Sequence, residues 1–188
     1  MQDKVIKLEN PVRIAELNPE GTLKKIGLRD GQTFCDIGAG SGIFTIPAAR
    51  ITSRTVYAVE ISAPMLAVIS DKARAEGLNH IRPILTEGDR YPIDEHSVDI
   101  VLMVTVLHEI ERKASLLEEI KRLLKADGTA AVIEFHKRET PMGPPVPRRL
   151  GQDEAIGIFK AAGFQPYSAF DLGNNFYCQL FKPVHISQ

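Results

Sequence analysis

The chain has 188 residues, of which 44% are hydrophobic and 25% are charged, and its formal net charge is −1. These values are typical of a globular domain with a substantial core, and the near-neutral charge argues against nucleic acid as a partner. No apolar run approaches the roughly 20 residues of a membrane helix, and the first residues lack the apolar stretch of a secretory signal. Cys35 and Cys178 form neither a disulfide framework nor a metal-binding spacing. We therefore predict a cytoplasmic protein without a metal.

Strand-like and helix-like segments alternate along the sequence. A short helix is expected within residues 10–21. The predicted strands cover residues 31–38, 54–61, 80–87, 97–107, 129–137, 164–170 and 174–183. The predicted helices cover residues 41–51, 63–77, 114–128 and 153–163. The run 97–107 is the most apolar of the strands, as expected for a central parallel strand.

Repeated strand–helix units predict an α/β fold with a doubly wound, mainly parallel sheet of seven strands. The last two strands, joined at residues 173–175, add an antiparallel edge strand. Within the helix at 63–77, Ser62 is the expected N-cap, Pro64 lies in the first turn and Gly77 ends the helix. We expect a single domain made of an N-terminal helical segment (1–30), a core (31–136), a loop (137–150), and a closing helix and strands (151–188).

Three glycines, Gly38, Gly40 and Gly42, directly follow the first predicted strand. Glycine costs roughly 0.5–1 kcal/mol relative to alanine in regular structure, so this stretch indicates a turn that needs bare backbone. A ligand could approach the N–H groups there, at the start of the next helix. The spacing differs from the dinucleotide pattern G-x-G-x-x-G because residue 43 is isoleucine, and it lacks the Lys-Ser/Thr of a P-loop. The carboxylate of Asp36 suits a ligand with an amino group. The alternative is a tight turn without a ligand.

This stretch resembles motif I of the class I S-adenosylmethionine-dependent methyltransferases, in which a strand and an acidic residue precede G-x-G-x-G. YAVEIS, LTEGDRYPI and SVDIVLMVTVL resemble later motifs of the same family. The resemblance implies a Rossmann-like fold with S-adenosylmethionine as cofactor. It also implies that Glu60 holds the two ribose hydroxyls, that Asp89 binds the adenine amino group, and that Val104 lines the cofactor. One carboxylate can accept both hydrogen bonds of a diol.

The residues that the resemblance assigns to the cofactor are Asp36, Gly38, Ala39, Gly40, Ser41, Gly42, Glu60, Ile61, Gly88, Asp89, Arg90 and Val104. Each acidic residue has a structural alternative. Asp36 could cap the next helix, Glu60 could be a solvated strand end, and Asp89 could be part of a simple turn.

The methyl acceptor is less well specified. The sequence is most similar to small-molecule methyltransferases of the quinone-biosynthesis and arsenite group, although cysteines for arsenic are not evident near the site. Residues 10–21 and 137–150 are the segments expected to cover the site. Arg148 and Arg149 could pair with an anionic substrate or form a solvated basic turn. His108 is the candidate general base; alternatively, it caps a helix or pairs with Glu109 or Glu111.

Other functions remain to be weighed. A protein or RNA methyltransferase that acts on amino groups often carries an Asn/Asp-Pro-Pro-Tyr motif after the fourth strand, where this chain reads VTVLHE. The glycine spacing disfavours an NAD-dependent oxidoreductase. A non-catalytic S-adenosylmethionine-binding protein stays open, because a sequence does not prove turnover. The oligomeric state is not determined by the sequence, and a homodimer is compatible with it.

Overall fold

The computed structural model describes residues 2–88 and 90–184. The chain divides into two compact units, Met1–Pro92 and Ile93–Gln188, which are called the first and the second unit below. Each unit carries strands covered by its own helices, and each is described by itself. None of the helices in the described residues has the length and apolar character needed to cross a membrane.

The first unit begins with three short helices, α1 (Gln2–Leu8), α2 (Pro11–Leu17) and α3 (Pro19–Ile26). The expected single helix over residues 10–21 is thus two helices. Each of the two starts at a proline, which suits the first turn because its missing N–H is not needed there. The side chain of Asn10 accepts hydrogen bonds from Val12 N and Arg13 N at the start of α2, and Asn18, in the left-handed region, separates α2 from α3.

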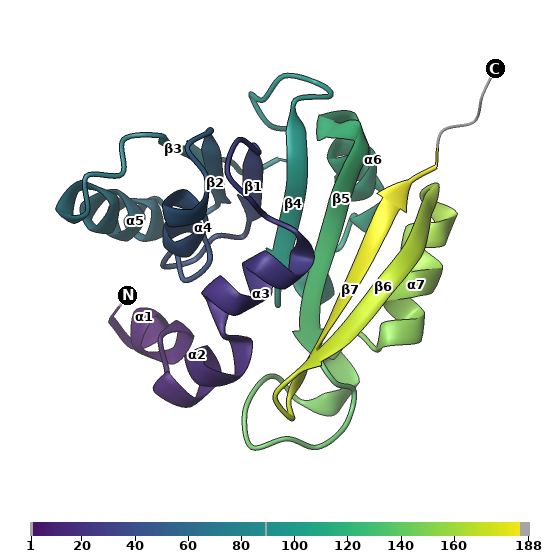
Figure 1. The fold of residues 1–188 in the computed structure, drawn as a ribbon. Coiled ribbons are helices and arrows are strands. Elements are labelled where there is room, and N and C mark those ends of the chain that lie inside the picture. The colour runs from purple at the N-terminus through teal and green to yellow at the C-terminus, as the bar shows by residue number, and fades with distance from the viewer. Residues whose placement is uncertain (1, 89, 185–188) are drawn as a thin grey trace. The chain divides into compact units, whose positions relative to one another are not determined.

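Three parallel strands follow, β1 (Phe34–Ile37), β2 (Val56–Glu60) and β3 (Ile81–Leu85), in the order β3-β2-β1. The helices α4 (Thr45–Ile51) and α5 (Ala63–Ala75) connect them and pack on β2 and β3 (Figure 1). Pro64 lies in the first turn of α5 and Gly77 follows its end at φ 69°, as predicted. Ser62 occupies the N-cap position, but its side chain makes no capping hydrogen bond.

The second unit contains β4 (Val98–Val104), β5 (Leu124–Phe135), β6 (Phe164–Leu172) and β7 (Phe176–Pro183). Strands β4 and β5 are parallel, whereas β7 is antiparallel to both of its neighbours, β5 and β6. The predicted hairpin is therefore present, but the antiparallel strand is not the edge strand. β7 is buried along nearly its whole length and β6 is largely exposed, so burial places β7 inside and leaves β6 at the edge.

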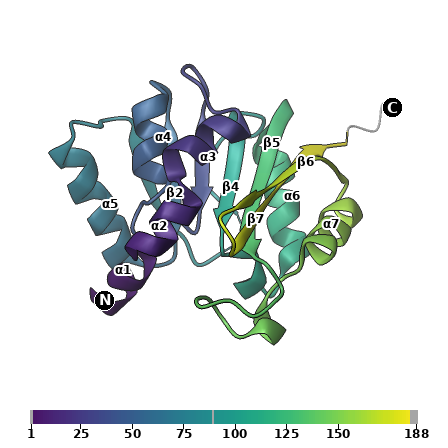
Figure 2. The same cartoon turned by 60° about the horizontal axis from the view of Figure 1, so that its bottom comes forward.

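Two α-helices and two short 3₁₀ helices complete the second unit. They are α6 (Lys113–Leu123), α7 (Gln152–Ala161), η1 (Leu107–Glu109) and η2 (Val146–Arg148). α6 packs on β5, and α7 packs on β6 and β7 (Figure 2). The helix predicted to run to residue 128 ends at Leu123 instead. Ser97 N donates to Leu123 O and Val98 pairs with Leu124, so the sheet takes over the backbone there.

Candidate functional site

The glycine turn after β1 is built from backbone that only glycine adopts easily. Gly38, Gly40 and Gly42 have φ angles of 73°, 53° and 84°. All three lie in the left-handed region, which penalises residues with a Cβ. A Cβ at Gly42 would also lie 2.9 Å from Ile69 Cγ1 of α5. Gly38 N donates to Val59 O at 2.8 Å, which ties the turn to β2.

Glu60, the last residue of β2, reaches this turn with its carboxylate. Its Oε2 accepts a hydrogen bond from Gly40 N at 2.8 Å, and its Oε1 accepts from Ile61 N at 3.0 Å and Ser62 N at 3.1 Å. The residue is 7% exposed. The three backbone donors fix the carboxylate at the edge of the glycine turn, so Glu60 is not the solvated strand end that the sequence left open.

Asp36 is buried beside the same turn. Thr45 Oγ1, at the start of α4, donates to Asp36 Oδ2 at 2.6 Å. The carboxylate therefore contacts the first residue of the next helix, as in the capping alternative. Burial raises the pKa of Asp36 to about 7; the hydrogen bond from Thr45 opposes the rise and the charge of Glu60 adds to it. Such a group changes its charge near neutral pH.

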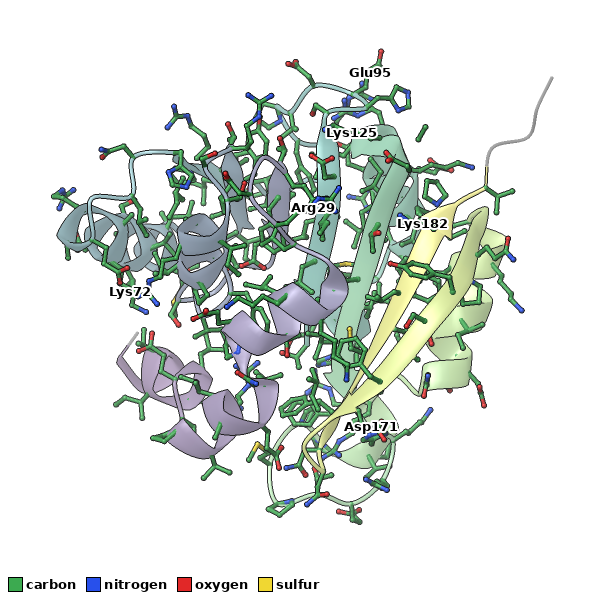
Figure 3. The ribbon with its side chains drawn as sticks, viewed as in Figure 1. Arg29, Lys72, Glu95, Lys125, Asp171 and Lys182 are labelled. Carbon is green, nitrogen blue, oxygen red and sulfur yellow. The ribbon has the colours of Figure 1, made fainter. Side chains whose placement is uncertain are left out.

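The end of α1 also contacts the glycine turn. Lys72 Nζ of α5 donates to Glu9 Oε1 at 2.6 Å and to Ser41 O at 2.8 Å; Figure 3 labels Lys72 at this place. A Cβ on Gly40 would meet Leu8 Cδ1 at 3.0 Å. We call the contacts between Glu9, Lys72 and Ser41 the latch. Residues just before the predicted covering segment 10–21 thus contact the turn.

The other predicted cofactor residues are placed less closely together. Ile61 follows Glu60 and is 72% exposed. Gly88 and Arg90 are exposed after β3, and Asp89 lies outside the described residues. Val104 is the last residue of β4 and belongs to the second unit, where it is buried. The contacts within the first unit bring together Asp36, Glu60 and the glycine turn.

In the second unit, His108 is bound by a residue that sequence reasoning missed. Glu134 Oε1 accepts from His108 N at 3.1 Å, and Glu134 Oε2 lies 2.7 Å from His108 Nδ1. The side chains of His108 and Glu134 are 7% and 1% exposed. The predicted alternative partner Glu109 lies 3.8 Å away, beyond hydrogen-bond range. A lone acidic residue in the apolar run AAVIEF was the available signal.

The hydrogen bond from the ring to Glu134 raises the pKa of His108 although burial opposes the rise. The charge of Glu109 acts in the same direction as that of Glu134, and the charge of Arg148 opposes it. The histidine is therefore a stronger base than a solvated one.

The chain bends sharply between β4 and His108. Thr105 has φ 54°, in the left-handed region, and its N–H donates to Ile133 O at 2.7 Å. A β-branched residue in this region is a genuine outlier, and such strain costs of order 1–3 kcal/mol. The bend leads directly into η1, which carries His108. Outliers of this kind cluster at functional sites.

Apart from η2, the loop 137–150 has no regular secondary structure, as its prolines predict. Arg149 donates hydrogen bonds to the carbonyl oxygens of Pro144, His136, Arg138 and Met142. Arg149 is 5% exposed, so it is neither a solvated basic residue nor positioned to bind an anion. Arg148 is exposed. Among the described residues, no group of three or more His, Cys, Asp and Glu side chains could hold a metal ion.

Comparisons with known proteins match these features. A family model described as a methyltransferase domain matches residues 35–132. The chain is 30% identical over 126 residues to the ubiquinone/menaquinone biosynthesis C-methyltransferase UbiE of Laribacter hongkongensis, which covers 65% of this chain and 51% of that protein. It is 34% identical over 112 residues to the demethylmenaquinone methyltransferase of Tropheryma whipplei, which covers 60% of this chain and 45% of that protein. The chain thus spans about half the length of these curated relatives.

A solved structure matches over a greater length. The crystal structure of a SAM dependent methyltransferase from Aquifex aeolicus has a TM-score of 0.91 at 27% identity and covers 98% of this chain and 99% of that chain. The chain therefore has a Rossmann-like α/β fold, as the sequence predicts.

Proposed function

Since the chain belongs to the family of methyltransferase domains, we propose that it transfers a methyl group from S-adenosylmethionine to a small-molecule acceptor. The observation that carries this proposal is the carboxylate of Glu60, held at the glycine turn by the N–H of Gly40. A carboxylate fixed beside the glycine turn suits a ligand that combines a diol with charged groups. The turn has the left-handed backbone that residues with a Cβ adopt poorly.

The residues of the first unit fit this cofactor. Glu60 accepts three backbone hydrogen bonds, whereas a carboxylate has about four acceptor sites. Binding both hydroxyls of a ribose therefore requires one of these bonds to be exchanged, and the bond from Gly40 belongs to the turn that would receive the ligand. Asp36, once ionised, would pair with the ammonium group. The other proposed cofactor contacts are Ala39, Ser41, Ile61, Gly88, Asp89, Arg90 and Val104.

The cofactor supplies an electrophilic methyl group on a sulfonium, whose displacement leaves a neutral thioether. This displacement creates little new charge for the protein to stabilise. The contribution of the chain is therefore alignment and exclusion of water, and alignment alone can be worth up to about 7–11 kcal/mol. The relatives' names concern ubiquinone, menaquinone and demethylmenaquinone. We accordingly propose a reduced quinone-like aromatic ring as the acceptor class.

The proposal extends to the sheet arrangement, the division of the chain, the cellular location and the class of substrate. A doubly wound sheet is favoured by the right-handed crossovers expected of parallel strands. The segments 1–30, 31–136, 137–150 and 151–188 remain our proposed division of one methyltransferase domain. A cytoplasmic location suits the two buried cysteines, Cys35 and Cys178. The near-neutral charge disfavours a nucleic acid substrate.

The proposal is tested with Glu60→Ala and calorimetry. S-adenosylmethionine should bind the variant more weakly by about 1.5–3 kcal/mol, the range for hydrogen bonds to a charged group. Glu118→Ala, at an exposed position of α6, is the control and should bind as the wild type does. A folded Glu60→Ala protein with unchanged affinity would show that the ribose assignment is wrong.

Turnover separates an enzyme from a non-catalytic binding protein. The wild-type protein is incubated with S-adenosylmethionine and 1,4-dihydroxynaphthalene, a reduced quinone ring, and S-adenosylhomocysteine is measured. Product formation above the rate without acceptor supports the reduced-quinone class. Tight binding of the cofactor without product over a panel of hydroxyl, thiol and amine acceptors would favour the binding protein.

A further inference from the structure

The contact between His108 and Glu134 fixes the histidine at two points. Both oxygens of one carboxylate are used, one by the backbone N–H of His108 and one by its ring Nδ1. Rotation of the ring would break the second bond, so the pair sets both the position and the orientation of the imidazole. When the ring is neutral, a proton on Nδ1 serves this bond and the lone pair is left on Nε2.

The surroundings favour a basic ring on His108. Glu134 is 1% exposed on β5, and a buried carboxylate is stable only when it is paired and hydrogen-bonded. The charged and titratable groups around the pair come from η1 itself and from two further elements. Glu109 of η1 lies 3.8 Å from Nε2, Arg148 of η2 acts on the ring by its charge, and Tyr177 of β7 pairs with Glu134 in the sheet.

In the neutral ring, Nε2 therefore carries the lone pair, and the bond to Glu134 uses Nδ1. Glu109 Oε1 lies 3.8 Å from Nε2, too far for a hydrogen bond, on a side chain that is 70% exposed. A histidine kept only for packing does not need a buried carboxylate behind it. The left-handed backbone at Thr105, which leads into the helical turn of His108, is a second feature that stability alone would not favour.

We propose that Glu134 is a positioning residue that holds His108 as the general base of methyl transfer. This inference rests on the proposed function and narrows its acceptor to a molecule whose reacting group carries a hydrogen at neutral pH, such as a phenolic hydroxyl. His108 Nε2 takes that hydrogen as a proton. The electron pair of the acceptor forms the bond to the methyl carbon, the carbon–sulfur bond breaks, and S-adenosylhomocysteine leaves as a neutral thioether. The imidazolium then releases its proton to water.

The first test needs neither acceptor nor cofactor. Long-range ¹H–¹⁵N NMR spectra of the wild-type protein report the tautomer and the pKa of His108. We expect the proton on Nδ1 in the neutral ring and a pKa above the usual 6.5. In Glu134→Gln the pKa of His108 should fall to 6.5 or below. Glu109→Gln is the control, because it removes a nearby charge that makes no hydrogen bond to the ring. In this variant Nδ1 of the neutral His108 should keep its proton. A wild-type ring with its proton on Nε2 would overturn the proposal even if the Glu134 variant did not fold.

The second test uses turnover with 1,4-dihydroxynaphthalene. His108→Ala should lower kcat by about 10²–10⁴-fold and leave the affinity for S-adenosylmethionine unchanged. The wild-type kcat should rise with pH through the pKa of His108, and in Glu134→Gln this rise should move to lower pH with a rate at least about tenfold smaller. A near-normal rate for His108→Ala would overturn the base role. Loss of cofactor binding in Glu60→Ala tests the proposed function separately, so the two proposals can fail independently.

Discussion

The glycine turn of the first unit and the histidine pair of the second unit are two candidate sites built in opposite ways. The first consists mainly of backbone N–H groups in left-handed conformations, supported by the buried carboxylates Asp36 and Glu60. The second consists of two side chains, 26 residues apart in sequence: His108 lies in η1 after β4, and Glu134 lies near the end of the neighbouring strand β5. A site made of backbone tolerates few changes of conformation, whereas a site made of side chains is tuned by charge. The predictions below probe this difference.

The largest effect is expected from Gly40→Val. The φ angle of Gly40 is 53°, and a Cβ there would press on Leu8 Cδ1 at 3.0 Å. The substitution places a branched side chain at the turn where the cofactor is proposed to bind, so we expect no measurable binding of S-adenosylmethionine by calorimetry.

Gly77→Val is the matched control for Gly40→Val. Gly77 has a similar φ of 69°, but no atom lies within 4 Å of its Cβ position. Both variants place a branched residue in the left-handed region, but only Gly40→Val changes the glycine turn after β1. If Gly77→Val loses cofactor binding to the same degree, backbone strain rather than occupation of the turn explains the effect.

The next largest effect should come from Arg149→Ala in the second unit. Arg149 bonds four carbonyl groups of residues 136–144 and its guanidinium lies 5.2 Å from the ring centroid of Phe135. Four partly buried hydrogen bonds from a charged donor would be lost, so the free energy of unfolding should fall by about 3 kcal/mol in urea denaturation. Arg149→Lys should recover little, because an ammonium cannot reproduce the planar fork.

Arg148→Ala tests the same loop at an exposed position and should change the free energy of unfolding by less than about 0.5 kcal/mol. Equal losses for the two arginines would mean that the hydrogen bonds of Arg149 do not organise the loop.

A smaller effect follows from the pKa of Asp36, which burial raises to about 7. Because an ammonium group pairs with the ionised carboxylate, the affinity for S-adenosylmethionine should rise about tenfold per pH unit between pH 5.5 and 7. Asp36→Asn should bind more weakly and without this slope. The comparison is made by calorimetry at several pH values, and a slope that persists in Asp36→Asn would exclude Asp36 as its source.

The raised pKa of Asp36 also makes the stability of the folded protein depend on pH. The folded pKa of Asp36 lies above its unfolded value of 3.8, so ionisation costs the folded protein free energy. The wild type should therefore lose stability relative to Asp36→Asn as the pH rises from about 4 to about 7, and the difference should then stay constant. The pair of His108 and Glu134 acts in the opposite sense. The raised pKa of His108 favours the folded state below its unfolded pKa, and this contribution is lost as the pH rises through the folded pKa.

The contrast between the sites also explains how much the sequence could predict. The glycine turn lies within five consecutive residues, and the strand before it and the helix after it follow from local patterns. Glu60 is distant in sequence, but the parallel order of β1 and β2 brings strand ends together in a predictable way. The fold class and the elements around the turn were therefore predicted largely correctly.

The second unit was predicted less well because its decisive contacts are not local. The partner of His108 depends on the register that joins β4 to β5, which places Glu134 beside the end of β4. The burial of Arg149 depends on carbonyl groups that the loop presents only once it is folded. Likewise, the start of β5 at Leu124 is set by pairing with Val98, which overrides the helical pattern. Apart from the lone acidic residue in the apolar run AAVIEF, these contacts leave no local sequence signal.

The smallest predicted effect concerns the latch between Glu9, Lys72 and Ser41. Lys72 and Glu9 are 35% and 31% exposed, and ion pairs near the surface contribute about 0.2–1 kcal/mol. Burial acts to raise the pKa of Glu9, but the hydrogen bond and charge of Lys72 outweigh it, so the net pKa is lowered. The ion pair of Glu9 and Lys72 therefore stabilises the folded protein above the usual carboxyl pKa, and this stabilisation is lost in acid.

Lys72→Met should loosen residues 2–17 rather than unfold the protein, because the ion pair joins the end of α1 to α5 and the glycine turn. Hydrogen exchange followed by mass spectrometry should show faster exchange in that segment, and 1 M salt should reduce the difference by screening. Lys24→Met is the control, since Lys24 and Glu20 form an ion pair with the same N–O distance of 2.6 Å between two exposed side chains of α3. If exchange in residues 2–17 is unchanged in Lys72→Met, then apolar contacts such as that of Leu8 hold α1 on the turn, and the backbone site in the first unit is independent of this ion pair.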